Sequence, residues 1–480
     1  MFFVDTITKN MARRAEVARA NDSIHPVMCH TVPSPHFNPI TCGSDDWALA
    51  KCCDLFGNSV GSDPMPADMM RSAARGKTVI NAEIHAIPGS TFHRPNPIGF
   101  EEMKRHVLVP LAHGIKGFLF WQYRPELLGG ESPAWGLTFP DGRPAPWLEP
   151  VSRICREVVG ESEFFLKADR REPEVGVFVS PANQVFCWAG TSGTRLHDAS
   201  ISGVYKALHA SNHSIDFVRP DDVLSGLLDD LKVLYMPLPY WVERDVLQRI
   251  REWVKRGGNL IGECFFAGMD VERGYHSKVT PGAGFDEVFG VQEGVTYPES
   301  GVFDSYSWSA EDAVEGIRVR LVEDIGSLAA GTICAGYQVG ACLTGSGAEV
   351  LADFPTGEAA VTCASYGQGT ATMIGTLLGA AYTEKKQEQC ARLISELVGR
   401  YAGADRPVVS PTGGVRVDVL SSGDKRWIML QNLTESVVET SVRIPGSESY
   451  GAVEMFTGER HASLDVELAP RQIRAFWHQG

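Results

Sequence analysis

The chain has 480 residues, of which 44% are hydrophobic and 21% are charged, enough for two or three domains with packed cores. Its formal net charge of −15 argues against nucleic acid or an anionic membrane as a partner, because binding phosphates needs a basic surface. The 11 cysteines include no CxxC pair, and neither a signal-like apolar leader nor a run of 18 apolar residues occurs, so we expect a cytoplasmic protein with reduced thiols and no metal site.

Residues 1–150 alternate short apolar runs with helical patterns. The runs that indicate strands are "HPVMCHTV", "DLFGNSVGSD", "KTVINAEI" and "KGFLFWQYR". Alternation of this kind predicts parallel βα units, whose functional residues lie at the carboxyl ends of the strands. We expect four such strands, arranged either as part of a barrel or as an open sheet.

Three further regions follow in the chain. Residues 151–174 contain a linker helix, bracketed by stretches rich in proline and charge. In residues 175–402, short apolar strands such as "VGVFVS" and "LKVLYMPLP" and the amphipathic helix in "ERDVLQRIREWVKRGG" predict a doubly wound α/β domain. In residues 407–480 the pattern changes to period two with turn residues between, which predicts a small antiparallel β domain.

Polar and aromatic side chains follow the third and fourth predicted strands of the first region. The candidates at this edge are Glu83, His85, His93, Arg94, Trp121, Tyr123, Arg124 and Glu131. Aromatic rings stack on the C–H faces of sugars, whereas carboxylates bond hydroxyls and stabilise an oxocarbenium-like transition state. The plain alternatives are a solvated surface carboxylate for Glu83 and a core position for Trp121.

Five features follow one another along the chain: Glu83, "LAHGIKGFLFWQYR", "GGESPAWGL", "EVGVFVSP" and "WVKRGGNLIGE". Their order resembles that of glycoside hydrolase family 42, the microbial β-galactosidases, and the resemblance covers nearly the whole chain. The resemblance implies strands five to eight of a TIM (β/α)8 barrel, then a flavodoxin- or amidotransferase-like α/β trimerisation domain, then the β domain. It also implies a homotrimer that needs no cofactor and hydrolyses terminal β-D-galactosides with retention.

The resemblance also assigns roles to residues. Glu83 stands where the family has its nucleophile, at the end of the seventh barrel strand. Glu131 matches a sugar-binding glutamate after the eighth strand, and Trp121 is a further sugar contact. Where the family has "FQWR" this chain has "WQYR", so Tyr123 replaces a common tryptophan, and the family's following histidine is absent from "ESPAWG". We expect Arg124 to orient the carboxylates and His85 to contact the substrate.

The general acid is missing from this pattern. A retaining glycosidase needs a second carboxyl group at roughly 5–5.5 Å from the nucleophile. The family supplies it from an Asn-Glu pair after strand four, but the sequence contains no Asn-Glu dipeptide, and "HPVMCHTV" corresponds to strand five. We therefore expect a family member without the first half of the barrel. Asp54 and Asp63 follow the wrong strand, and an aspartate before proline commonly starts a turn.

Two other functions remain open. The first is a non-catalytic or subunit-type protein that oligomerises and binds saccharide, or that pairs with a separate N-terminal half-barrel, because an incomplete barrel exposes sheet edges and an apolar interior. The second is a thiol-dependent, amidotransferase-like hydrolase centred on Cys264 in "GECFFAG". The plain alternative for Cys264 is a buried, inert thiol.

Overall fold

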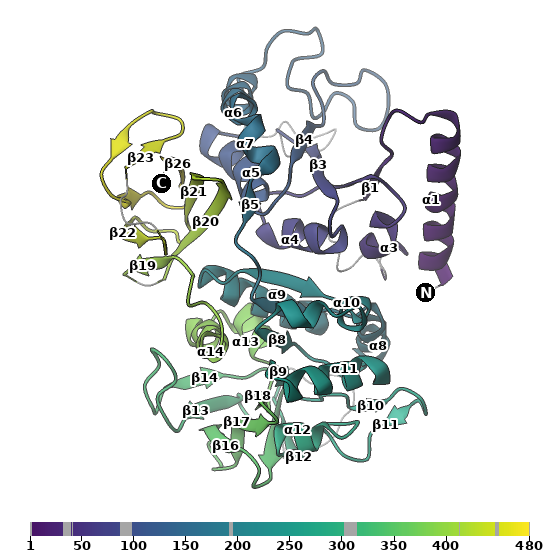
Figure 1. Cartoon of the computed structure of the whole chain (residues 1–480), viewed down its shortest axis with the longest axis vertical. Coiled ribbons are helices and arrows are strands. Elements are labelled where there is room, and N and C mark those ends of the chain that lie inside the picture. The colour runs from purple at the N-terminus through teal and green to yellow at the C-terminus, as the bar shows by residue number, and fades with distance from the viewer. Residues whose placement is uncertain are drawn as a thin grey trace. The chain divides into compact units, whose positions relative to one another are not determined.

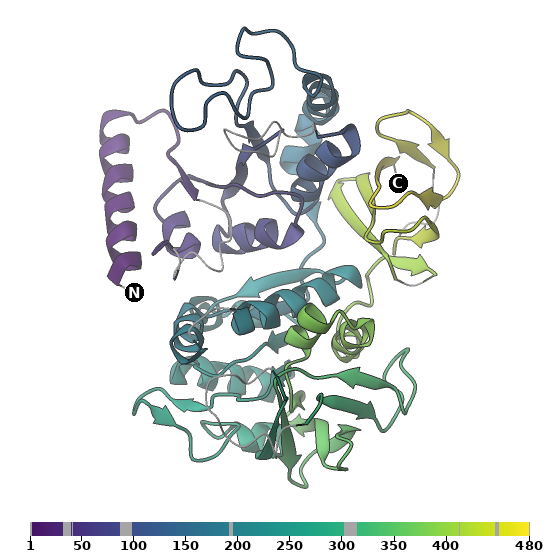
Figure 2. The ribbon, with the colours of Figure 1, turned by 180° about the vertical axis from the view of Figure 1, so that it is seen from behind.

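The computed structural model describes residues 2–31, 40, 42–86, 98–191, 195–301, 314–411, 413–446 and 451–479. The chain forms two compact units, Met1–Arg171 with Asp405–Gly480, and Glu172–Ala404 (Figure 1, and from behind in Figure 2). Both units contain helices and strands, so the mixed α/β class is confirmed. Across these ranges, every helix is too short or too polar to cross a lipid bilayer.

The first unit is built on a four-stranded parallel sheet. Its strands lie in chain order, β1 (Met28–Thr31), β2 (Leu55–Asn58), β3 (Thr78–Ile84) and β4 (Gly117–Phe120). The four expected strands are therefore present and parallel. The helices between and around them are α1 (Phe2–Asn21), α3 (Asp46–Ala50), α4 (Pro64–Ala73), α5 (Phe100–Ala112), α6 (Leu148–Gly160) and α7 (Ser162–Lys167).

Helices cover one face of this sheet. Cys29, Phe56 and Val79 alternate onto that face and are buried against residues of α3 and α4. Helix α4 starts where it does because the Asp63 carboxylate accepts a hydrogen bond from Met65 N at 3.0 Å and Pro64 occupies the first turn. The expected structural role of Asp63 is thus confirmed.

The C-terminal strands of the first unit are antiparallel, as the period-two pattern predicted. One sheet has the order β24-β23-β26-β21-β20-β5, and a smaller sheet has the order β19-β22-β25. Their bounds are β5 (Asp169–Arg170), β19 (Val408–Ser410), β20 (Val415–Ser422), β21 (Lys425–Asn432), β22 (Val438–Arg443), β23 (Ala452–Glu454), β24 (Arg460–His461), β25 (Asp465–Leu468) and β26 (Ile473–Gln479).

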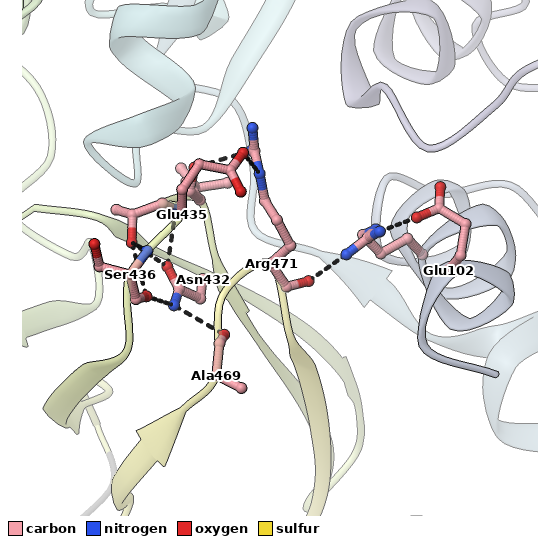
Figure 3. A network of polar contacts seen from close by, with 9 residues as sticks. Glu102, Asn432, Glu435, Ser436, Ala469 and Arg471 are labelled. Atoms are coloured by element: carbon pink, nitrogen blue, oxygen red, sulfur yellow. Dashed lines mark hydrogen bonds and ion pairs between the residues drawn. The ribbon is translucent and has the colours of Figure 1, made fainter. Parts of the chain in front are cut away.

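These strands share a core with the helices of the parallel sheet. Trp427 and Ile473 are fully buried in one cluster with residues of α5, α6 and α7. Lys104 of α5 is buried and donates a hydrogen bond to the Ile473 carbonyl at 2.8 Å. In a second link, Arg105 Nη1 of α5 donates to the Arg471 carbonyl at 2.6 Å. Figure 3 shows Arg471 and, on the same helix as Arg105, Glu102. The parallel sheet and the C-terminal strands therefore form one folding unit.

A buried ionic cluster reinforces that junction. Asp68 of α4 lies 2.9 Å from His113 Nδ1 and 2.6 Å from Arg170 Nη1 of β5. Burial alone would raise the pKa of Asp68, but His113 and Arg170 together hold it well below its ordinary value. Since β5 pairs with β20, the cluster connects α4 and α5 to the C-terminal sheet.

The second unit is built on an 11-stranded mixed sheet. Its parallel part has the order β7-β6-β8-β9, continued by β18. The bounds are β6 (Val175–Phe178), β7 (Ile215–Val218), β8 (Val233–Met236), β9 (Asn259–Glu263) and β18 (Gly369–Ile374). The doubly wound pattern predicted these strands, which alternate with α8 (Pro181–Thr191), α9 (Arg195–Ala210), α10 (Pro220–Ser225), α11 (Arg244–Lys255), α13 (Leu378–Lys385) and α14 (Glu388–Gly399).

Antiparallel strands extend this sheet in a way the sequence did not predict. They are β12 (Gln292–Pro298), β13 (Arg318–Leu321), β14 (Ile333–Ala335), β15 (Val339–Thr344), β16 (Glu349–Asp353) and β17 (Ala359–Tyr366). β17 pairs with β18 and so joins the two parts. A short hairpin, β10 (Met269–Asp270) and β11 (Tyr275–His276), and helix α12 (Phe285–Phe289) lie between β9 and β12 in the chain.

Candidate active site

A β-bulge determines which way Glu83 points. Asn81 pairs with Phe118 and Ile84 pairs with Phe120, so Ala82 and Glu83 together lie opposite Leu119. One extra residue in a strand reverses the alternation of side chains beyond it. Ile84 is therefore buried in the helix-side core at 2% exposure, and Glu83 turns to the opposite, open face of the sheet.

Two histidines flank the Glu83 carboxylate. His85 Nε2 lies 2.8 Å from Glu83 Oε1, and His30 Nε2, at the end of β1, lies 3.8 Å from Glu83 Oε2. The Glu83 side chain is 30% exposed. The carboxylate is thus held from two sides, by His30 of β1 and by His85 directly after β3, while staying accessible to solvent.

The loop after β4 supplies an aromatic wall beside this cluster. Trp135 stacks on the His85 ring at a centroid distance of 4.2 Å and an interplanar angle of 28°. Its backbone is fixed because Gln122 N donates to the Trp135 carbonyl at 2.9 Å. Trp121 N in turn donates to the Ile84 carbonyl at 2.9 Å, which places Trp121, 38% exposed, directly beside the strand that carries Glu83.

The residues predicted further along this loop lie on the surface. Tyr123 is 67% exposed, and Glu131 is exposed as well. Arg124 Nε donates to the Pro140 carbonyl at 3.1 Å. Within the described ranges, no hydrogen bond or ion pair joins Arg124 or Glu131 to Glu83, so their roles in a sugar site stay predictions. His93 and Arg94 lie outside the described residues.

Sequence reasoning missed His30, Ser59 and Trp135. A signal existed for two of them, because His30 ends the first predicted strand and Trp135 stands in "ESPAWG" close to Glu131. Ser59 Oγ lies 2.9 Å from His30 Nε2, the same nitrogen that faces Glu83. A Ser-His-carboxylate triad needs the serine and the carboxylate on different ring nitrogens. These three residues therefore form a polar cluster and not a triad.

Neither aspartate considered as a replacement acid is free for that task. Asp54 forms an ion pair with Arg19 at 2.8 Å and accepts a hydrogen bond from Val27 N at 2.8 Å. The hydrogen bond from Arg19 lowers the pKa of Asp54, which favours the ionised form and opposes proton donation. Asp63 caps α4. Both carboxylates have structural partners, as expected.

Cys264 lacks the properties of a catalytic thiol. It is 0% exposed, and burial, with Glu293 and Glu263 nearby, raises its pKa well above the ordinary value. A reactive cysteine needs access and a lowered pKa. The residue with positive φ after β9, where a nucleophile elbow holds its nucleophile, is Phe265 at 62°. The geometry supports the inert-thiol interpretation.

Comparison with known proteins places the second unit in a family. Residues 188–400 match the family model of the β-galactosidase trimerisation domain. Over 405 residues the chain is 25% identical to β-galactosidase BgaB of Geobacillus sp. (strain Y412MC61), covering 80% of this chain and 53% of the relative. It is also 25% identical over 381 residues to β-galactosidase LacZ of Heyndrickxia coagulans, covering 76% and 49%. The chain therefore spans about half the length of the curated relatives it matches.

Solved structures share the fold along the whole chain. The β-galactosidase from Bacillus circulans sp. alkalophilus superposes with a TM-score of 0.78 at 16% identity, over 99% of this chain and 66% of that one. A family 42 exo-carrageenase from Bacteroides ovatus gives a TM-score of 0.61 at 12% identity, over 100% and 55%. The fold is thus that of family 42 glycoside hydrolases. Together with the trimerisation-domain match and the curated relatives, it supports a family 42 β-galactosidase-like protein, as the sequence resemblance predicted.

Proposed function

We propose that this chain carries the nucleophile of a retaining β-galactosidase-type glycoside hydrolase, and that Glu83 is that nucleophile. The observation that supports the proposal is the bulge in β3, which puts a 30% exposed carboxylate on the open face of a parallel sheet, at its carboxyl end. Substrates of such a site are terminal β-D-galactosides or related glycosides.

In this proposal the residues around Glu83 have distinct roles in catalysis and in sugar binding. The Glu83 carboxylate attacks the anomeric carbon and forms a glycosyl-enzyme ester, which water then hydrolyses. His85 positions Oε1 of Glu83 by the 2.8 Å contact. Trp121 and Trp135 offer ring faces to the sugar, and Tyr123, Arg124 and Glu131 on the same loop complete its contacts after the loop closes on the substrate.

The general acid is supplied by another segment of polypeptide. The hydrogen-bonding and ion-pairing partners of Glu83 within the described residues are histidines, and Asp54 and Asp63 are engaged elsewhere. We take β1 to β4 as strands five to eight of a TIM barrel, in which strands one to four pair with the edge strands β1 and β4 and so enclose the open face. The exposed apolar side chains Met28 (36%) and Leu119 (50%) are consistent with such a partner. The match of residues 188–400 to a trimerisation domain supports a homotrimer.

The test uses substrates that differ in their need for an acid. Without an acid, a retaining enzyme still expels a leaving group that is stable unprotonated, because acid catalysis contributes about 10²–10⁴-fold and matters most for poor leaving groups. We expect slow release from a dinitrophenyl β-galactoside and no hydrolysis of lactose. A 2-deoxy-2-fluoro analogue should label Glu83, as read by peptide mass spectrometry. Lactose hydrolysis at ordinary rates by the chain alone would overturn the missing-acid inference.

The alternative is a non-catalytic subunit that binds saccharide. It predicts that galactose binds equally to the native chain and to Glu83→Gln, and that no residue is labelled by the fluoro-sugar. Adding a polypeptide with the first four strands and its Asn-Glu pair distinguishes the two, since only a functional Glu83 allows lactose turnover to be restored.

A further inference from the structure

We propose that the second unit binds a small anionic molecule in a pocket distinct from the Glu83 site. The pocket has a volume of about 580 Å³ and is formed by the first half of α11, the β10–β11 hairpin and residues 277–285. Figure 1 shows the hairpin beside α11. Small-molecule sites typically measure about 300–1,000 Å³. The inference is independent of the function proposed for Glu83.

The pocket lies at the functional edge of its sheet. Strand β6 pairs with β7 on one side and with β8 on the other, so the chain reverses its winding direction there. In open α/β sheets, ligands bind outside the carboxyl ends of the strands, and this pocket follows β8 and β9, one strand away from the switch point between β6 and β8. The lining begins with Val242 after β8 and resumes with Met269 after β9, so both contributions follow the carboxyl ends of neighbouring strands.

The lining is basic although the chain is acidic. It contains four cationic side chains, Arg244, Arg251, Arg273 and Lys278, against two carboxylates, Asp270 and Glu272. This gives the lining a charge of +2, or +1 when Glu287, which pairs with Arg251 from outside the lining, is counted, whereas the whole chain carries −15. A local field opposite in sign to the net charge selects anions at this position.

The cations are not all neutralised by their neighbours. Each lining arginine has a carboxylate partner: Arg244 pairs with Glu272 at 2.7 Å, Arg273 pairs with Asp270 at 3.7 Å, and Arg251 contacts Glu287. Lys278 is exposed at the rim and forms no ion pair with any residue that the structure describes. Lys278 therefore offers an ammonium group to a ligand.

A glycine and an apolar floor shape the pocket. Gly284 has φ 78°, and a Cβ there would lie 2.9 Å from Arg251 Nη1, so any larger residue would push the guanidinium aside. Val242, Leu247 and Phe285 line the floor and are at most 3% exposed. The combination fits a phosphate or carboxylate held by arginine and lysine, attached to a ring or short chain that covers the floor.

The experiment measures binding by isothermal titration calorimetry on the full chain, with galactose 1-phosphate, inorganic phosphate and galactose as probes. We expect galactose 1-phosphate to bind more tightly than inorganic phosphate, and any binding of galactose, which the Glu83 site can also take, to be unchanged by substitutions in this pocket. Lys278→Glu with Arg273→Glu should weaken galactose 1-phosphate about tenfold or more, because two charge-assisted contacts are lost. Both side chains are exposed, and an unchanged thermal transition confirms that the variant folds.

The matched control is Lys255→Glu, on α11 but outside the lining, which alters the charge of the same helix. It should change the affinity less than about twofold, since an exposed charge outside the site is screened by salt. Equal weakening by Lys255→Glu would overturn the site and leave only a general charge effect. Equal affinity for inorganic phosphate and galactose 1-phosphate would overturn the role of the apolar floor. Absence of binding by any phosphate probe would overturn the proposal as a whole.

Discussion

Two glutamates stand at the carboxyl end of a parallel strand, one in each unit, and their surroundings differ. Glu83 lies in a bulge, is 30% exposed and faces two histidines. Glu263 ends β9 at 0% exposure and accepts hydrogen bonds from Tyr235 Oη at 3.1 Å and Gly379 N at 3.0 Å. Burial raises the pKa of Glu263 to about 7 despite those hydrogen bonds. Glu83 and Glu263 thus occupy the same position in their strands. They differ in solvent accessibility, which makes Glu83 a candidate nucleophile and Glu263 a structural carboxylate.

The two sheets explain that difference. Every residue of β6, β7 and β8 is buried, as expected for a parallel sheet covered on both faces. In the first unit, β1 alternates exposed and buried residues, and Leu119 of β4 is exposed. Within the described residues, one face of the first sheet is left uncovered, and Glu83 lies on it.

The comparison is tested most strongly by removing the exposed carboxylate. Glu83→Gln should lower dinitrophenyl β-galactoside cleavage by about 10⁴-fold or more, since loss of a nucleophile removes the covalent route. Glu126→Gln, an exposed residue of the loop after β4, is the control and should retain the activity. The measurement is the initial rate of dinitrophenolate release. Equal activity in native protein and Glu83→Gln would assign the cleavage to another group.

The stability of the first unit should depend on its helix side and not on its open face. Asp68→Ala removes the carboxylate that His113 and Arg170 share in a buried cluster, so we expect a loss of about 3–5 kcal/mol in the free energy of unfolding. Asp141→Ala removes an exposed pair with Arg143 and should cost far less, because exposed ion pairs contribute little to stability. Denaturant titration of both variants gives the values, and equal losses would contradict this assignment.

The low pKa of Asp68 also sets a pH dependence. Because its folded-state pKa lies below the ordinary value of 3.8, its stabilisation is present above that pH and is lost as the pH falls through the folded-state value. Asp68→Asn should therefore flatten the acid limb of the stability curve. An unchanged acid limb would show that other groups control acid unfolding.

Glu263, in the sheet of the second unit that is covered on both faces, should give the opposite pH dependence of stability. The folded-state pKa of Glu263, about 7, lies above its ordinary 4.5, so its stabilisation is present below about pH 4.5 and is lost as the pH rises through 7. The difference corresponds to about 3 kcal/mol. Calorimetry of the second unit's transition should show this loss. Glu263→Gln should reduce it, and the remainder comes from Glu293, whose pKa burial also raises to about 7, whereas Glu252→Gln, exposed on α11, should leave it unchanged. Stability that increases between pH 5 and 7 for this transition would refute it.

The smallest expected difference in the free energy of unfolding is between substitutions of one leucine in each sheet. Leu119→Ala in β4 removes a 50% exposed side chain and should cost less than about 1 kcal/mol, whereas Leu234→Ala in β8, at 0% exposure, should cost about 2–5 kcal/mol. Both values come from chemical denaturation. A cost of several kcal/mol for Leu119→Ala would mean that the open face is covered in solution.

Sequence patterns predicted the parts of the fold that depend on local periodicity. The four parallel strands and the antiparallel C-terminal strands are of this kind, because period and turn residues specify them within a few residues. The extension from β12 to β17 was missed, since its pairing partners, such as Gln292 and Thr344, are far apart in sequence. The bulge was missed as well, because it is a shift in the pairing of β3 with β4, and the sequence of β3 alone does not indicate it.

Sequence reasoning placed Glu83, His85 and Trp121 at one edge, because the carboxyl ends of parallel strands meet there. It missed His30, whose contact with Glu83 depends on the registers of β1, β2 and β3. It also missed Trp135, because the return of the loop after β4 follows from backbone hydrogen bonds to Gln122. Local sequence patterns thus identified the sheet edge that carries Glu83, whereas the residues that contact Glu83 depend on the pairing of the strands and on the path of the loop.

The pairing of β5 with β20 has a consequence for biosynthesis. Arg170 pairs with Leu420, so 250 residues separate the two partners in the chain. At about 5–20 residues per second, a ribosome synthesises Leu420 roughly 12–50 s after Arg170. During that interval the second unit, which is continuous in sequence, can fold, whereas the apolar sides of α5 to α7 await Trp427 and Ile473. The nascent first unit is therefore the part of this protein that most needs a chaperone during translation.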